Sequence, residues 1–385
     1  MDIVFGVILG IIVLTILVVI HELGHALVAR RNGVVVEEFG VGFPPLAWGK
    51  KVKKSLLGKN VLFSVNWLPL GGFVKLQGEN DSADRPGDYG AVTFWQKTKI
   101  LLAGVAMNWL TAVVLFSFLA AIGLPKILPN QFSIPSDTQT IRQPVELVSI
   151  VDGSPAEKAG LQQGDKIIRF AGEPLEGAAD LSRLAKDNGG KMVEVIYSRN
   201  NVEASTPVTL RDNNDDKKGY LGAGSAQQEL IKASWSAPIV GFGTTVQMTA
   251  VTLQGLGDVI GKGLSGLVLQ FSFDEDTKTA AKADLATVGD SVAGPVGIFG
   301  VIFPAAEKAG PTHVILLAAI ISLTLAVMNI LPIPALDGGR WFVTALFRAL
   351  KKPLNKDIEE KIHGAGFMAL MFLVVLITIA DIGKL

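Results

Sequence analysis

The stretch Ile3–Ile20, IVFGVILGIIVLTILVVI, is followed directly by His21-Glu22-Leu23-Gly24-His25, and together these residues decide the fold. The apolar run carries no charge and approaches the roughly 20 helical residues that cross a bilayer core of about 30 Å. Only Asp2 carries a charge ahead of it, and no small-residue cleavage site follows, which favours a retained span over a signal peptide. Because ionisable side chains are costly in hydrocarbon, those that continue this helix indicate a functional site.

The composition is also typical of a membrane protein. Of the 385 residues, 49% are hydrophobic and 18% are charged, below the roughly 25% of soluble domains. The 35 basic and 35 acidic residues cancel, so no net field attracts nucleic acid. The absence of cysteine excludes disulfides, thiolate catalysis and cysteine metal sites. Further apolar runs at 100–124, 314–336 and 367–380 predict about four transmembrane helices in all.

The distribution of lysine and arginine orients these spans. Basic residues crowd the segments after the first and third spans, whereas the N-terminus and the tail after the fourth span carry almost none. By the positive-inside rule, residues 30–97 and 340–362 face the cytoplasm, and both termini and residues 125–312 face outside.

The HELGH sequence matches the H-E-x-x-H pattern of zinc hydrolases. On a helix, His21 and His25 lie on one face and can share one Zn²⁺. Glu22 is offset by one residue, so it can act as general base on a metal-bound water without being a ligand. The alternative is a polar cluster that links helices or lies at the membrane interface.

A catalytic zinc ion needs a third protein ligand. The spare histidines are His313, which is expected on the opposite side of the membrane, and His363, which resembles an interfacial residue. Asp337 is the better candidate, because it follows two helix-breaking prolines in NILPIPALDGG (residues 329–339) and falls on the same side as HELGH. Alternatively, Asp337 is a turn residue at a helix end.

A compact module is predicted at about residues 144–226. A strand-like segment at 145–151 precedes SPAEKAGLQQGDKII (residues 154–168), and further strand-like alternation returns at 193–197 and 208–210. This block closely resembles a PDZ domain of the protease-associated bacterial type. PDZ domains bind chain ends by strand addition, so a C-terminal peptide ligand is expected. Gly219–Gly222 resembles the carboxylate-binding strand of a permuted PDZ domain, with an ordinary strand and turn as the alternative.

Together, HELGH, NILPIPALDGG and the PDZ-like module resemble the site-2 protease family, and most closely its bacterial regulator-of-sigma-E-protease-like members. The resemblance implies an intramembrane zinc metalloprotease of the bacterial inner membrane. It implies single-span membrane protein substrates, such as anti-sigma factors or remnant signal peptides, usually cut first on the outside. By motif, His21, His25 and Asp337 would hold Zn²⁺ and Glu22 would be the catalytic base.

Two further elements match this family. Gly71–Leu76 resembles its membrane-associated β-hairpin, whose open edge could bind an extended substrate through Gly71, Gly72 and Phe73. Gly104 and Asn108 match its Gly-xxx-Asn element. Asn108 and Asn329 could bind substrate backbone or an oxyanion, or they could join helices instead.

The resulting fold class is a polytopic α-helical membrane protein with a membrane-associated β-hairpin and an inserted extracytoplasmic PDZ domain of mixed α/β structure. We expect a membrane core at 1–124, the PDZ domain at 125–235, an amphipathic segment at 236–312 and a second membrane core at 313–385. The acidic stretches at 77–90 and 274–276 are interpreted as solvated. The rival functions are a non-catalytic scaffold that uses the PDZ domain and a metal transporter.

Overall fold

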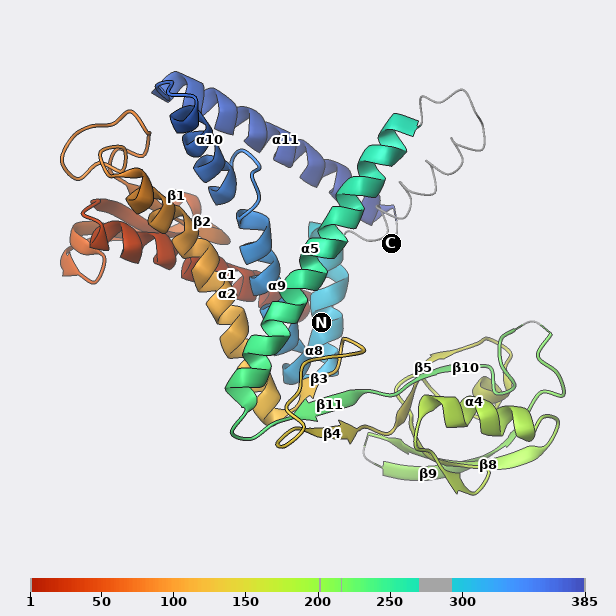
Figure 1. The fold of residues 1–385 in the computed structure, drawn as a ribbon. Coiled ribbons are helices and arrows are strands. Elements are labelled where there is room, and N and C mark those ends of the chain that lie inside the picture. Colours follow the sequence, from red (N-terminus) through yellow and green to blue (C-terminus); the bar gives the residue numbers. More distant parts are fainter. Residues whose placement is uncertain (1, 201, 216, 270–292, 384–385) are drawn as a thin grey trace. The chain divides into compact units, whose positions relative to one another are not determined.

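The computed structural model describes residues 2–200, 202–215, 217–269 and 293–383 (Figure 1). The acidic run 274–276 lies outside these residues. The chain divides into two compact units. Residues 1–120 and 237–385 form one, called here the membrane unit, and residues 121–236 form the other, called the inserted unit.

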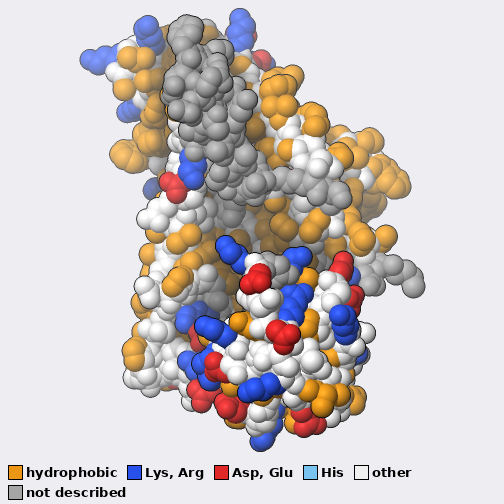
Figure 2. Space-filling model, turned by 90° about the vertical axis from the view of Figure 1, so that its right-hand side faces the viewer, with side chains coloured by type: hydrophobic (Ala, Val, Ile, Leu, Met, Phe, Trp, Pro, Cys, Tyr) orange, Lys and Arg blue, Asp and Glu red, His pale blue; other side chains and the backbone are white. Residues whose placement is uncertain are grey.

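Four described helices of the membrane unit are long and apolar enough to cross a membrane, matching the four apolar runs. They are α1 (Asp2–Arg31), α2 (Phe94–Ile122), α9 (Pro311–Asn329) and α11 (Lys356–Ile382). Ile8, Ile12 and Ile16 of α1 are each at least 50% exposed, as lipid-facing side chains would be. On the face drawn in Figure 2, hydrophobic side chains cover wide areas outside the inserted unit. Basic and acidic side chains are interspersed over the surface of that unit.

A twisted antiparallel hairpin follows α1 and consists of β1 (Val36–Ser55) and β2 (Gly58–Leu76). Both strands fold back on themselves, so that Phe39 of β1 pairs with Val74 on one side and with Phe63 on the other. Buried Val36, Val61 and Leu76 pack with Ala26 of α1 and Ile100 of α2 in one core. The hairpin is therefore anchored to the helix that carries HELGH.

The remaining helices fill out the membrane unit. They are α5 (Ala237–Leu269), α7 (Pro295–Gly297), the π-helical segment η1 (Ile298–Ile302), α8 (Phe303–Ala309) and α10 (Asp337–Ala349). Trp109 of α2 donates a hydrogen bond to Thr249 of α5 (3.1 Å). The glycine-rich α5 is not among the four candidate spans and packs on the helix bundle.

The inserted unit contains two small sheets. The larger has the order β10-β5-β6-β8-β9, with β7 added to β6, and the smaller has the order β3-β11-β4. The strands are β3 (Leu124–Pro125), β4 (Gln139–Arg142), β5 (Val145–Ile150), β6 (Lys166–Phe170), β7 (Glu173–Pro174), β8 (Met192–Arg199), β9 (Val202–Thr209), β10 (Ala223–Ala226) and β11 (Glu229–Lys232).

Helices α3 (Pro155–Lys158) and α4 (Ala178–Asp187) complete the inserted unit, and buried Leu147, Phe170 and Leu184 lie in its core. The Ser154 side chain caps the N-terminus of α3 by accepting a hydrogen bond from the Glu157 N–H, a role that serine commonly has at this position. Gly219–Gly222 is not a strand: it forms the bend that leads into β10, with positive φ at both glycines.

Candidate metal centre

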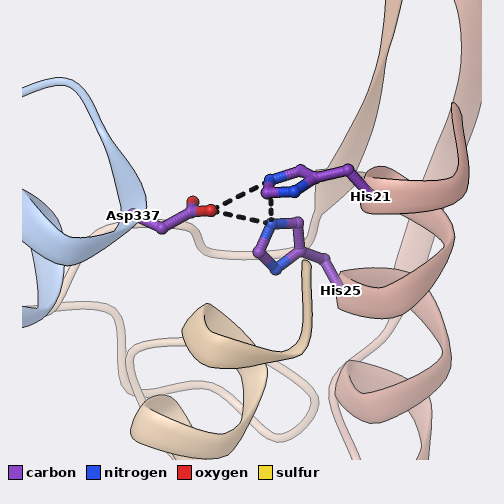
Figure 3. A group of neighbouring side chains, drawn as sticks. All are labelled: His21, His25 and Asp337. Carbon is purple, nitrogen blue, oxygen red and sulfur yellow. Dashed lines mark hydrogen bonds and ion pairs between the residues drawn. The ribbon is translucent and has the colours of Figure 1, made fainter. Parts of the chain in front are cut away.

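His21 and His25 stand one turn apart on α1, and each is only 7% exposed. Asp337 reaches them from the first residue of α10. Figure 3 shows the two imidazole rings and the carboxylate converging on one point. The His21 Nε2–Asp337 Oδ2, His25 Nε2–Asp337 Oδ2 and His21 Nε2–His25 Nε2 distances are 3.0, 3.2 and 3.1 Å.

The broken helix expected around the two prolines delivers Asp337. Helix α9 ends at Asn329, and a tight turn follows before α10 begins. Gly338 and Gly339 are needed here, because a Cβ at either position would overlap the carbonyl oxygens of Ile330 and Ile333. Asp337 is 316 residues from His21 in the sequence, yet the turn places its carboxylate beside the His21 ring.

The donor set fits Zn²⁺. In a tetrahedral site with bonds of about 2.0–2.1 Å, ligand atoms lie roughly 3.3–3.4 Å apart. The observed separations of 3.0–3.2 Å are close to this spacing. The backbone of α2 also approaches the site at Gly104, where a Cβ would lie 2.6 Å from His21 Cε1 and closer still to His25 Nε2. Glycine is thus what leaves room for both rings.

Hydrogen bonds behind the rings fix their orientation. His25 Nδ1 lies 2.8 Å from the Ile100 carbonyl oxygen, so Nδ1 carries the proton and Nε2 is left to bind a metal. His21 Nδ1 lies 3.4 Å from Asn108 Nδ2, while the buried Asn108 Oδ1 has no hydrogen-bond partner. With His21 Nε2 on a metal, rotating this amide would let Oδ1 accept the Nδ1 proton and turn its NH₂ group away.

Glu22 lies beside the cluster but outside the three-ligand group. Its carboxylate accepts the Val74 N–H of β2 at 3.1 Å. Glu22, Asn108 and Asn329 line one cavity of about 200 Å³ together with His21 and Asp337. Two residues far apart in sequence, Asn108 on α2 and Asn329 at the end of α9, are thus brought to one space beside the candidate metal position.

The predicted hairpin residues lie close to α1 rather than in that cavity. A Cβ at Gly71 would contact Val18, and one at Gly72 would contact Val19 and the Gly40 carbonyl oxygen. Phe73 pairs with Gly40 of β1. The two histidines set aside above are not in the metal cluster, although His363 Nδ1 accepts the Ala335 N–H at 3.2 Å and so contacts the turn before Asp337.

A buried polar network next to the cluster escapes sequence reasoning. Arg340, one turn after Asp337, donates to the Glu79 carbonyl oxygen and lies 3.5 Å from Glu359 of α11. Its guanidinium also covers the ring of Tyr89 at 4.9 Å. Burial raises the pKa of Tyr89, so its hydroxyl stays neutral. The sequence signal for this network is the spacing of Asp337 and Arg340, which puts both side chains on one face of a helix.

The fold and the cluster define a polytopic α-helical membrane protein in which three side chains from two helices could hold a metal ion. Residues 9–373 match the family model for Peptidase family M50, so the chain belongs to that family. A Clostridium perfringens protein, named provisionally as a zinc metalloprotease, is 31% identical over 98% of both chains. The zinc metalloprotease RasP of Bacillus licheniformis is 26% identical over 96% of both. The regulator of sigma-W protease RasP of Bacillus subtilis is 25% identical over 98% of both.

Proposed function

We propose that this chain, a zinc metalloprotease of the site-2 type, hydrolyses peptide bonds within the transmembrane segments of single-span membrane proteins. The observation that carries the proposal is the convergence of His21, His25 and Asp337 beside a helix apolar enough to cross a membrane. The name of the Bacillus subtilis relative supports substrates of the anti-sigma-factor kind. Remnant signal peptides are the second substrate class, and a prior cut outside the membrane is expected for both.

In this proposal His21, His25 and Asp337 hold the zinc ion. When bound, Zn²⁺ polarises the scissile carbonyl and lowers the pKa of a water molecule. Glu22 takes the proton of that water and then passes it to the leaving amine, which agrees with its position on the same cavity as His21. The Ile100 carbonyl holds the His25 ring in the tautomer that this arrangement needs.

Substrate would lie extended between the hairpin and the turn that precedes Asp337. A helical substrate has its amides satisfied internally and must unwind before its backbone can be cut. The edge of β2 at Gly71, Gly72 and Phe73 offers backbone groups to pair with the unwound segment. Asn108 and Asn329 supply side-chain amides in the same cavity as Glu22, where they can bind substrate carbonyls or the developing oxyanion.

The chain is a multi-pass membrane protein, and we place it in the bacterial inner membrane with its active site towards the cytoplasm. The lysines of the hairpin tip, Lys50, Lys51, Lys53, Lys54 and Lys59, are all exposed and support a cytoplasmic position for β1 and β2. Both termini and the inserted unit would then lie outside.

The inserted unit would be a PDZ domain that screens substrates before they enter the membrane unit. A cavity of about 250 Å³ lies between α4 and β10, lined by Leu181, Ala185 and the Gly219–Gly222 bend. An extended chain end added beside β10 would have its carboxylate near that bend. If a variant without residues 144–226 still discriminated between full-length and trimmed substrate, this screening role would be wrong.

The direct test compares wild type with Glu22→Gln in membranes that contain a tagged, trimmed single-span substrate. The variant keeps the shape and the zinc ligands but removes the base, so we expect cleavage to be lost while zinc stays bound. Glu37→Gln is the matched control, because Glu37 is exposed and its only ion pair among the described residues is with Lys75 (3.0 Å). Zinc binding without cleavage by wild type would favour the scaffold function instead.

A further inference from the structure

Two backbone donors on the open edge of β2, beside the metal centre, are already occupied. Residues 72–76 pair with β1 on one side and have no strand partner on the other among the described residues. The Gln77 N–H donates inward to the Val35 carbonyl oxygen. Because N–H direction alternates along a strand, those of Val74 and Leu76 point to the open side. Glu22 accepts the first at 3.1 Å, and Glu79 accepts the second at 2.7 Å.

These two carboxylates block the edge that a substrate strand would use. An incoming extended chain pairs by placing its carbonyl oxygens on such outward N–H groups, so it must replace both glutamates. The end of the strand opens onto a second cavity of about 320 Å³, which Glu79 and Asp337 both line. Glu79 therefore lies at the end of the edge strand, on the same cavity as the proposed metal ligand Asp337.

We propose that Glu22 and Glu79 cap the free edge of β2 until substrate displaces them, so that strand addition releases the base. This inference rests on the proposed function. The Val74 N–H holds one oxygen of Glu22, Oε2, against the strand, and a substrate carbonyl on that N–H sets this oxygen free. Glu79 is a positioning residue: it sets how readily substrate takes the edge and touches no reacting atom.

Two conservative variants separate the cap from the charge of Glu79. Glu79→Asp keeps the charge but shortens the side chain by one methylene, which withdraws the acceptor from the Leu76 N–H. Glu79→Gln removes the charge but keeps an oxygen within reach of that N–H. The contact with Arg340 is made by the Glu79 backbone oxygen, so neither substitution removes it.

The experiment measures KM and kcat for the zinc-loaded full chain in proteoliposomes with a trimmed single-span substrate. Glu79→Asp should lower KM about fivefold, the effect of roughly one net hydrogen bond, with kcat within twofold of wild type. Glu79→Gln should keep the wild-type KM. Glu37→Ala, on the paired strand, serves as the control, and zinc content and thermal unfolding are checked for every variant.

Three outcomes contradict the inference: an unchanged KM in Glu79→Asp, a raised KM in that variant, or a KM shift in Glu79→Gln that equals it. The last result would assign the effect to charge. Each of these leaves proteolysis by wild type intact, so the proposed function survives. Absence of cleavage by wild type, by contrast, would overturn the proposed function and this inference with it.

Discussion

Gly104 of α2 faces His25 of α1 with no room for a side chain between them, since a Cβ at residue 104 would overlap the Nε2 atom of the His25 ring. Two helices thus meet at the metal centre through a backbone rather than a side chain. The family's Gly-xxx-Asn pattern acquires a physical reason: the glycine admits the rings, and Asn108 one turn later contacts His21.

We therefore predict that Gly104→Ala disturbs zinc binding. The methyl group must push at least one imidazole from its place, and we expect zinc affinity to fall about tenfold or more, as when the support of a metal ligand is lost. Zinc titration of the detergent-purified protein measures this. Gly257→Ala in α5, where a Cβ meets open space, should bind zinc like wild type. Equal affinity in both variants would contradict the packing argument.

Removal of the metal should abolish activity reversibly. Since His21, His25 and Asp337 are the only described group with metal-ligand spacing, a strong chelator should stop cleavage and one equivalent of Zn²⁺ should restore it. Asp337→Ala should not be rescued by the same addition. Full activity of the chelated protein, verified by metal analysis, would exclude a role for the ion in hydrolysis.

His363 should stabilise the turn that carries Asp337. It accepts the Ala335 N–H, and Ala335 has a φ of 81°, in the left-handed region where alanine needs support. We expect His363→Ala to weaken zinc binding by about tenfold without abolishing it. Exposed Lys361 lies on the same helix, so Lys361→Ala is the control. A His363 variant with wild-type zinc affinity would show that the turn holds without this contact.

In the inserted unit, the ion pair between buried Asp165 and partly exposed Arg199 predicts a pH-dependent stability. Burial opposes ionisation of Asp165, but Arg199, with two contacts of 2.7 Å, outweighs it and lowers the pKa of that carboxyl. A lowered folded pKa stabilises the fold above the unfolded value of about 3.9, and the gain is lost as the pH falls through the folded pKa. The protection of the β6 amides against hydrogen exchange, relative to their intrinsic exchange rate at each pH, should therefore fall below about pH 4.

Substitution tests the same pair. Asp165→Ala should lower the free energy of unfolding of the inserted unit by about 2 kcal/mol, because the hydrogen bonds that Arg199 donates to the buried carboxylate are lost. Asp187→Ala, which breaks an exposed pair with Arg183 (3.8 Å) at the end of α4, should change little. Equal effects of the two substitutions would mean that burial adds nothing to the Asp165 pair.

The sequence predicted most of what the chemistry needs. The apolar runs gave the four candidate spans, and the periodicity of HELGH put both histidines on one helix face. The two prolines predicted the helix break that separates Asp337 from α9. These features succeed because each depends on neighbours a few residues away, where helix geometry and hydrocarbon solubility dominate.

Long-range contacts were beyond such reasoning. The sequence indicates the hairpin only at residues 71–76, whereas β1 and β2 together extend from residue 36 to residue 76, with a register set by pairing on both sides of Phe39. The contact of Glu22 with the Val74 N–H spans 52 residues and involves a backbone atom, which leaves no sequence pattern. Likewise, the sequence indicates an interfacial position for His363, whereas in the structure its ring contacts the turn before Asp337.

The central claim, hydrolysis inside the membrane at this zinc centre, is tested most directly by locating the bond that is cut. Zinc-loaded wild type and Glu22→Gln are reconstituted separately with a trimmed single-span substrate, and the products are mapped by mass spectrometry. We predict a cut within the apolar segment of the substrate for wild type and none for Glu22→Gln. A cut confined to the soluble flanks, or the same cut in both preparations, would contradict the account.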